Sequence, residues 1–188
     1  MKTSRVYSVL CSLLLVYAAQ VYCAPATGGK SELFTLDHLR AAGAEVTSNA
    51  YPDADAVVVD GWEQVRYNAD GTSRSVEDVC YKVLTEKGRR ELRTLSFFYD
   101  VAYGTVVVTK LEIIKPDGAV TPVDLAQQAR DMTETSQMSM NIYDPNLKTL
   151  KVSVPGLEIG DLVRCAAQEI ITKARVPNTW AEIAPLED

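Results

Sequence analysis

The residues best suited to nucleophilic catalysis are two cysteines in the main body of the chain and its single histidine. A catalytic thiolate needs a neighbouring base and often lies at a helix N-terminus, which lowers its pKa. Cys80 and Cys165 instead lie within runs that alternate like strands, and His38 lies beside Leu36 and Leu39 in an amphipathic segment. The sequence therefore predicts no catalytic residue, and we expect the chain as given not to be an enzyme.

Cys80 and Cys165 have two interpretations that the sequence leaves open. Each could be a buried free thiol that packs as a small apolar residue. They could instead form a disulfide, which requires an oxidising compartment and Cβ atoms within about 4.5 Å of each other.

Metal and cofactor sites are not predicted. Asp53 and Asp55 precede the run Ala56-Val57-Val58-Val59, which supplies none of the alternating oxygen ligands that a calcium loop needs, and Asp117 belongs to a turn. No glycine-rich phosphate loop follows a strand, because "ATGGK" (26–30) comes directly after the N-terminal leader.

The elements that position these residues are mainly strands. Runs rich in β-branched and aromatic residues occupy 56–67, 73–85, 93–100, 104–115, 147–155 and 161–174. Helical periodicity is confined to 31–45, where Ser31 could cap a short amphipathic helix, and to a weaker turn around 123–131. The sequence predicts a mainly β fold: an antiparallel β-sandwich with a short N-terminal amphipathic helix. In this sandwich, Val107, Leu111 and Ile113 face the core across from Val79, Tyr81 and Val83.

Three glycine-terminated segments read as turns: "NADG" (68–71), "TEKG" (85–88) and "KPDG" (115–118). In the last, Pro116 presets φ, Asp117 tolerates the next position and Gly118 supplies the left-handed conformation that closes a hairpin with a bulge. Residues 130–146 are polar and read as a long connection.

The N-terminus has the order of a secretory signal. Lys2 and Arg5 precede an apolar run that ends in the small residues of "CAPA" (23–26). A retained anchor and a lipid-modified Cys23 are the weaker interpretations. We expect four segments: a signal peptide (1–24), a linker with a short helix (25–50), the β-sandwich domain (51–176) and a connection to further sequence (177–188). The mature protein is expected in the periplasm or outside the cell, without a stable membrane span.

The charge of the chain argues against nucleic acid as a partner. The sequence has 19 basic and 25 acidic residues, and loss of Lys2 and Arg5 with the signal leaves 17 against 25, a formal charge of −8. Binding to phosphates normally requires a basic face. No nucleic-acid partner is therefore expected.

Four segments resemble, in order and spacing, the domain of unknown function 3857 (DUF3857). They are "YPDADAVVVDG", "YKVLTEKGRRE", "IIKPDGAVTPVD" and "IYDPNLKTLKVSVPGLEIGDLV", and the similarity covers about residues 50 to 175. The resemblance implies an exported bacterial β-sandwich that stands immediately ahead of a transglutaminase-like domain in one longer polypeptide. No segment here supplies the Cys, His and Asp of such a domain, so the sequence is expected to be part of a longer protein. The resemblance supplies no functional residue.

Two functions follow as hypotheses. The first is a non-catalytic module that supports or positions a transglutaminase-like, cysteine-protease-like domain, with Trp180 near the seam between them. The second is a free-standing module that binds glycans or peptides through exposed aromatic side chains. The candidate aromatics are Trp62, Tyr67, Tyr99, Tyr103 and Tyr143.

Overall fold

Strands make up most of the regular structure in the computed structural model, which describes residues 34–133 and 144–179. The helices are α1 (Leu36–Glu45), α2 (Glu86–Leu92) and α3 (Leu125–Gln128). The strands are β1 (Ala56–Tyr67), β2 (Ser73–Val83), β3 (Thr94–Asp100), β4 (Gly104–Ile114), β5 (Val120–Pro122), β6 (Ala129–Thr133), β7 (Leu147–Ser153) and β8 (Leu162–Ile171). The fold is mainly β, as predicted.

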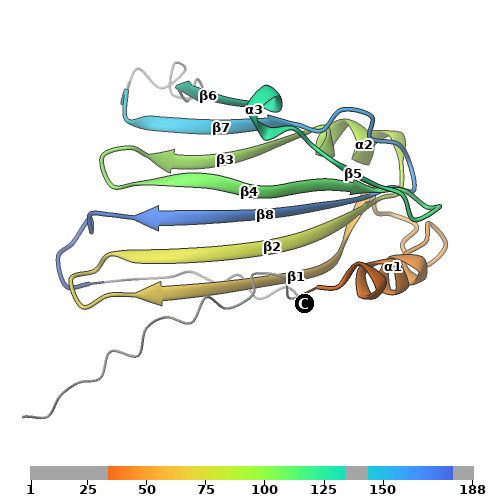
Figure 1. Cartoon of the computed structure of the whole chain (residues 1–188), viewed down its shortest axis with the longest axis horizontal. Helices are drawn as coiled ribbons and strands as arrows, with labels where there is room; N and C mark the ends of the chain where they lie inside the picture. The colour runs from red at the N-terminus through yellow and green to blue at the C-terminus, as the bar shows by residue number, and fades with distance from the viewer. Residues whose placement is uncertain (1–33, 134–143, 180–188) are drawn as a thin grey trace, which may run out of the picture.

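The strands form two antiparallel sheets (Figure 1). The larger has the order β1-β2-β8-β4-β5 and the smaller has the order β3-β7-β6. The last strand, β8, is the centre of the larger sheet, where it pairs with both β2 and β4. The two sheets approach each other where β3 of the smaller one contacts β4 of the larger.

The inner faces of both sheets share one hydrophobic core. Val83 and Val163 come from the larger sheet and Val152 from the smaller, and all three are fully buried. Complete burial of a valine side chain contributes about 1.5 kcal/mol or more to folding. Along β2 the inner face becomes polar in the direction of Ser75 and Glu77, so this core fills one end of the molecule.

Helix α1 covers part of the outer face of the larger sheet. Its Leu39 packs with Cys80, Ile114 and Leu162 in a second buried cluster. The N-cap is Thr35, whose hydroxyl accepts a hydrogen bond from the His38 backbone N–H. The predicted cap, Ser31, lies outside the described residues. The helix has ten residues, and no helix in the described ranges is long and apolar enough to span a membrane.

A buried ion pair lies on the same outer face. Arg164 of β8 donates to both carboxylate oxygens of Asp78 on β2, at 3.0 and 2.6 Å, and its third nitrogen lies 3.4 Å from Glu112. Arg164 is 2% exposed and Asp78 is completely buried. Buried charges of this kind must be paired, because an unpaired charge away from water is very costly.

A β-bulge in β4 places one residue that was predicted to face the core, Val107, on the outer face instead. The register with β8 shifts between Val108 and Lys110, so Val108 points into the core with 8% of its surface exposed. Val107 therefore points outward and is 46% exposed, while Leu111 and Ile113 beyond the bulge face the core as predicted. One extra residue reverses the alternation of a strand.

Two segments that read as connections form regular structure. "TEKG" begins helix α2: the Thr85 hydroxyl caps it by accepting from the Gly88 N–H, and a Cβ on Gly88 would lie 2.0 Å from the Asp55 carbonyl oxygen. The glycine thus permits close contact between helix and loop. Residues 129–133, which overlap the start of the polar segment, form β6 by pairing with β7.

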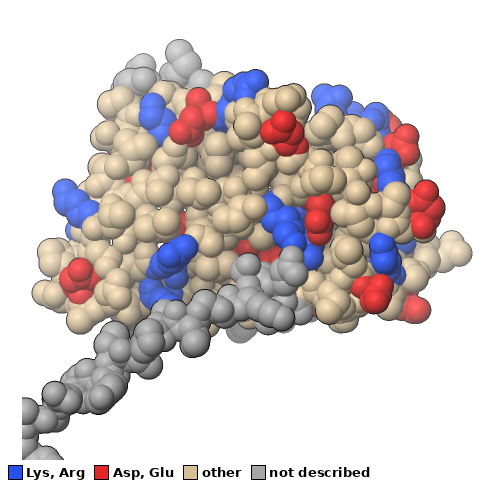
Figure 2. Space-filling model, viewed as in Figure 1, with Lys and Arg blue, Asp and Glu red and all other residues tan. Residues whose placement is uncertain are grey.

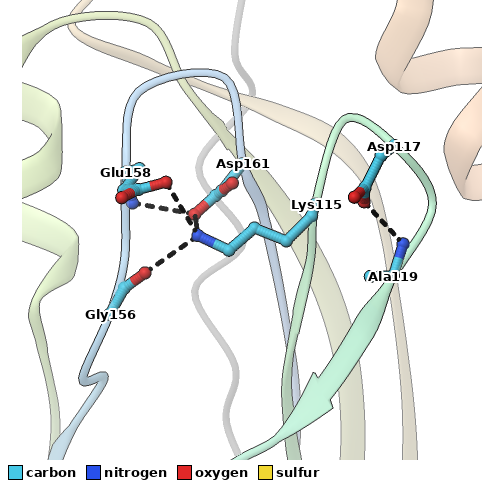
Figure 3. Close-up of polar contacts among 6 residues, drawn as sticks. All are labelled: Lys115, Asp117, Ala119, Gly156, Glu158 and Asp161. Carbon is cyan, nitrogen blue, oxygen red and sulfur yellow. Dashed lines mark hydrogen bonds and ion pairs between the residues drawn. The ribbon is translucent and has the colours of Figure 1, made fainter.

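The "KPDG" segment forms the predicted turn between β4 and β5 (Figure 3). Gly118 has φ +88°, and the Asp117 carboxylate accepts a hydrogen bond from the Ala119 N–H at 2.9 Å. Lys115 extends from the start of the turn to the buried Asp161 carboxylate, 2.8 Å away, and to the Gly156 carbonyl oxygen at 3.0 Å. These contacts join two neighbouring loops and give the turn a structural role.

Candidate functional site

The two cysteines lie on opposite faces of the larger sheet. Cys165 of β8 stands opposite Val79, the residue before Cys80 on β2, and successive side chains of a strand point to opposite faces. Both are buried free thiols, Cys80 beneath α1 and Cys165 between the sheets. Burial raises the pKa of each thiol to about 12, so neither is a thiolate at neutral pH.

His38 joins α1 to β1. Its Nε2 lies 2.6 Å from an Asp60 carboxylate oxygen, and its ring stacks on Phe34 with centroids 5.8 Å apart. Cys80 is completely buried beneath the same helix. The imidazole is held by a carboxylate at the surface and contacts neither thiol in the described structure.

Carboxylates do not gather into a metal site in the described ranges. No group of three or more His, Cys, Asp or Glu side chains there could hold a metal ion. Asp55, one of the aspartates considered from the sequence, accepts hydrogen bonds from the Thr85 hydroxyl at 2.6 Å and from Lys87 at 2.5 Å. These bonds, that from Lys87 foremost, lower the pKa of Asp55, and they fasten α2 to the loop before β1.

Three of the five candidate aromatics meet in one cavity. Tyr67 ends β1, Tyr99 lies near the end of β3, and Tyr103 precedes β4, and all three line a cavity of about 610 Å³. We call it the open-end pocket. Trp62 does not take part, because it stands opposite Asp78 on the outer face. Tyr143 lies outside the described residues.

The open-end pocket lies at the ends of strands from both sheets. Its walls include Phe98, Leu147, Ile171 and Val176. The segment after β8 closes one side, because the backbone N–H groups of Thr172 and Lys173 both donate to the Tyr103 carbonyl oxygen. An aromatic and aliphatic cavity with a few polar groups is the usual form of a binding site.

Cations of the chain itself lie against the rim of the open-end pocket. The Arg175 guanidinium lies 4.2 Å from the Tyr103 ring centroid, and it donates to an Asp100 carboxylate oxygen at 3.1 Å. The Lys173 ammonium lies 5.6 Å from the same ring. These are cation–π distances, so the rim already accommodates positive side chains.

Tyr99 is held on the other side by Asp131 of β6. Its hydroxyl lies 2.7 and 2.6 Å from the two carboxylate oxygens. Burial and this carboxylate raise the pKa of Tyr99 to about 12. Tyr99 is therefore a neutral hydrogen-bond donor with a fixed ring.

A second cavity, of about 320 Å³, continues from the open-end pocket along the inner face of the larger sheet. Phe98 and Glu169 line both cavities. The floor of the second cavity carries three carboxylates from neighbouring strands, and we call it the acidic groove. They are Glu63 (β1), Glu77 (β2) and Glu169 (β8).

The three glutamates share one face by register. Glu63 stands opposite Glu77, Glu77 opposite Ala167, and Glu169 is two residues beyond Ala167. Burial first, and then the charge of Glu63, raise the pKa of Glu77 and of Glu169. Sequence reasoning missed this cluster, since the residues are far apart in the chain and only strand order brings them together.

Charge on the visible surface is mixed. Figure 2 shows Lys and Arg side chains interspersed with Asp and Glu over the described part of this face, without one extended basic patch.

Comparison with solved structures shows which known proteins this chain resembles in fold. A crystal structure of a candidate protease from Parabacteroides distasonis matches 64% of this chain with a TM-score of 0.57 and 15% identity. The chain covers only 24% of that protein. A family 3a carbohydrate-binding module from the Clostridium thermocellum cipA scaffolding matches with a TM-score of 0.29 and 12% identity, covering 59% of this chain and 76% of that one.

None of the curated proteins compared with the chain matches it. A family does match: residues 69–187 correspond to DUF3857, a domain of unknown function with a solved structure. This range covers most of the strands described above, including β2, β8 and β4. The chain therefore belongs to the DUF3857 family.

Proposed function

We propose that this chain is a non-catalytic β module that supports or positions a protease-like, transglutaminase-like domain in a longer polypeptide. The observation that carries the proposal is the fold shared with the candidate protease, of which this chain matches only 24%. The remainder of that protein lies outside the match, which leaves room there for a separate catalytic domain.

The chemistry of the described residues supports a non-catalytic role. A thiol nucleophile requires a lowered pKa and a base within reach. Burial gives Cys80 and Cys165 the opposite shift, and His38 is bound to Asp60. The chemistry of a longer protein would then come from residues beyond this module.

Thiol labelling of the native protein tests the non-catalytic part of the proposal. We expect Cys80 and Cys165 to react with iodoacetamide only after unfolding, since both are buried free thiols. Peptide mass mapping with and without urea measures the difference. Stoichiometric labelling of native Cys80 that His38→Ala abolishes would contradict the proposal.

The positioning role has its own test. The polypeptide that follows Asp188 in the host protein should contain Cys, His and Asp in that order, and the purified catalytic segment should bind this module in calorimetry. A segment of unrelated composition, or a catalytic segment whose activity and stability are the same with and without this module, would refute the positioning role.

A second function is favoured by the open-end pocket. Three tyrosines and several aliphatic side chains line its 610 Å³, which is ample for part of a glycan or peptide. Binding there would require no catalysis. Tyr103→Ala should abolish such binding, whereas Trp62→Ala, on the opposite face of the sheet, should leave it unchanged.

A further inference from the structure

The segment that follows β8 crosses the rim of the open-end pocket. Strands β1, β3 and β8 all end on this side of the molecule (left in Figure 1). We call residues 172–179 the exit segment. Its first two backbone N–H groups donate to the Tyr103 carbonyl oxygen, at 2.8 and 3.0 Å. Further along, Val176 and Thr179 line the pocket, so the exit segment forms part of its wall.

Contacts at both ends hold the exit segment in one path. Near its start are the contacts of Arg175 described above. Near its end, the Asn178 backbone N–H donates to the Asp70 carbonyl oxygen in the turn between β1 and β2, at 3.2 Å. A Cβ on Gly71, which has φ +85°, would lie 2.8 Å from the Thr179 carbonyl oxygen, so a glycine is needed for this close contact. The polypeptide beyond Thr179 therefore starts from a fixed point at the pocket rim.

The same pocket carries the two most exposed large apolar side chains of the described residues. Phe98 is 67% exposed and Val176 is 60% exposed, and both line the open-end pocket. They come from different parts of the chain, β3 and the exit segment, and meet only at this site. Apolar surface that gathers in this way on a folded protein usually marks a site of contact with another protein surface.

Several polar side chains of the pocket are already bonded within the chain. The contacts are Arg175 with Asp100, the Tyr99 hydroxyl with Asp131, and the Lys148 ammonium with the Thr133 hydroxyl at 2.9 Å. What these bonds leave for a partner is chiefly the aromatic and aliphatic surface of Phe98, Leu147, Ile171 and Val176. Aromatic anchors surrounded by a polar rim are the usual composition of the centre of a protein interface.

We propose that the open-end pocket and the exit segment form the docking surface for the domain that follows in the longer polypeptide, and that this domain inserts an apolar loop into the pocket. The inference rests on the positioning function proposed above, and it specifies the surface through which the module holds its partner. Residues 180–188 can span at most about 30 Å, so the polypeptide beyond Asp188 begins near the pocket. A short connection of this kind gives the partner a high effective concentration at the surface.

Labelling of an introduced surface cysteine tests the proposal, because both cysteines of the described fold are buried. Val176→Cys is treated with a maleimide in the chain that ends at Asp188 and in the complete polypeptide of the host. We expect labelling to be about tenfold slower in the complete polypeptide, since the partner covers the site. Ile159→Cys is the matched control. Ile159 is 53% exposed in the loop before β8, at the other end of that strand, and its labelling rate should be the same in both proteins.

Hydrogen exchange gives a second readout. Residues 98–103 and 172–179 should exchange about tenfold more slowly in the complete polypeptide than in the chain that ends at Asp188. In the complete polypeptide, Val176→Asp should remove this protection and Ile159→Asp should leave it. The Tm of the chain that ends at Asp188 should be the same with and without Val176→Asp, which separates loss of docking from loss of folding.

Equal labelling of Val176→Cys in the two proteins would overturn the proposal and leave the pocket open to the glycan or peptide of the second function. Slower labelling of Ile159→Cys alone would overturn it while the positioning role stands, through another surface. Neither measurement depends on which residues follow Asp188, and it is those residues that test the positioning role itself.

Discussion

At the scale of single residues, the acidic groove makes stability depend on pH. The pKa of Glu77 is raised above its ordinary value of 4.5 by burial and by Glu63. The folded protein therefore binds the proton more tightly than the unfolded chain does. Ionised Glu77 opposes folding at pH values above the raised pKa, and this cost disappears as the pH falls below about 4.5.

Glu77→Gln is expected to stabilise the protein at pH 7 by a few tenths of a kcal/mol, since solvent screens this partly exposed carboxylate. The gain should shrink at pH 4, where Glu77 is mostly protonated in both states. Urea denaturation of both proteins at the two pH values measures this. A stabilisation that is the same at pH 4 and pH 7 would show that charge is not its cause.

The buried pair of Arg164 and Asp78 is a second feature at the residue scale. Asp78→Asn removes the carboxylate that pairs with the Arg164 guanidinium, which is only 2% exposed. Because this buried positive charge then lacks its main partner, we expect the free energy of unfolding to fall by about 3 kcal/mol. Asp37→Asn is the matched control, because Asp37 is 94% exposed in its pair with Arg40 and should change stability by less than about 0.5 kcal/mol. Chemical denaturation compares the two, and equal effects would contradict the account of the buried pair.

At the scale of elements, the bulge in β4 decides which valine belongs to the core. Val108 is 8% exposed and Val107 is 46% exposed. Val108→Ala is therefore expected to cost about 1 to 2 kcal/mol through lost burial and a small cavity. Val107→Ala should cost a few tenths. Thermal denaturation would show a lower Tm for Val108→Ala only, and the reverse order would mean that the bulge is misplaced.

Helix α2 illustrates how elements depend on one another. The hydroxyl of its cap, Thr85, also donates a hydrogen bond to the Asp55 carboxylate. The backbone carbonyl oxygen of Asp55 accepts hydrogen bonds from the Leu84 and Thr85 N–H groups. Gly88 permits that contact. A seven-residue helix is too short to be stable alone, so packing against the loop before β1 is what maintains it.

At the scale of the whole molecule, the N-terminal sequence predicts export. We expect the mature protein to begin between Ala24 and Thr27 and to be recovered from the periplasm or the medium of its own host. Intact-mass measurement of the recovered protein determines the first residue. Soluble cytoplasmic protein that retains Met1 would refute the prediction.

Much of the fold could be predicted from local pattern. Alternation of β-branched and aromatic residues located the long strands, and Pro116, Asp117 and Gly118 specified the turn between β4 and β5, because these signals act over neighbouring residues. The same locality explains the errors. "TEKG" has the composition of a turn, and only the contact between Gly88 and the Asp55 loop makes it a helix.

The sequence by itself determined the mainly β class, the hairpin turn, the short N-terminal helix and the resemblance to DUF3857. Tertiary structure alone decided what the side chains do together. The order β1-β2-β8 brings Glu63, Glu77 and Glu169 onto one face, and the pairing of β2 with β8 puts Cys80 and Cys165 on opposite faces. Such relations depend on which strands become neighbours and in which register, and a shift of one residue reverses every side chain. Local sequence carries no record of that choice, so the site emerged only from the folded chain.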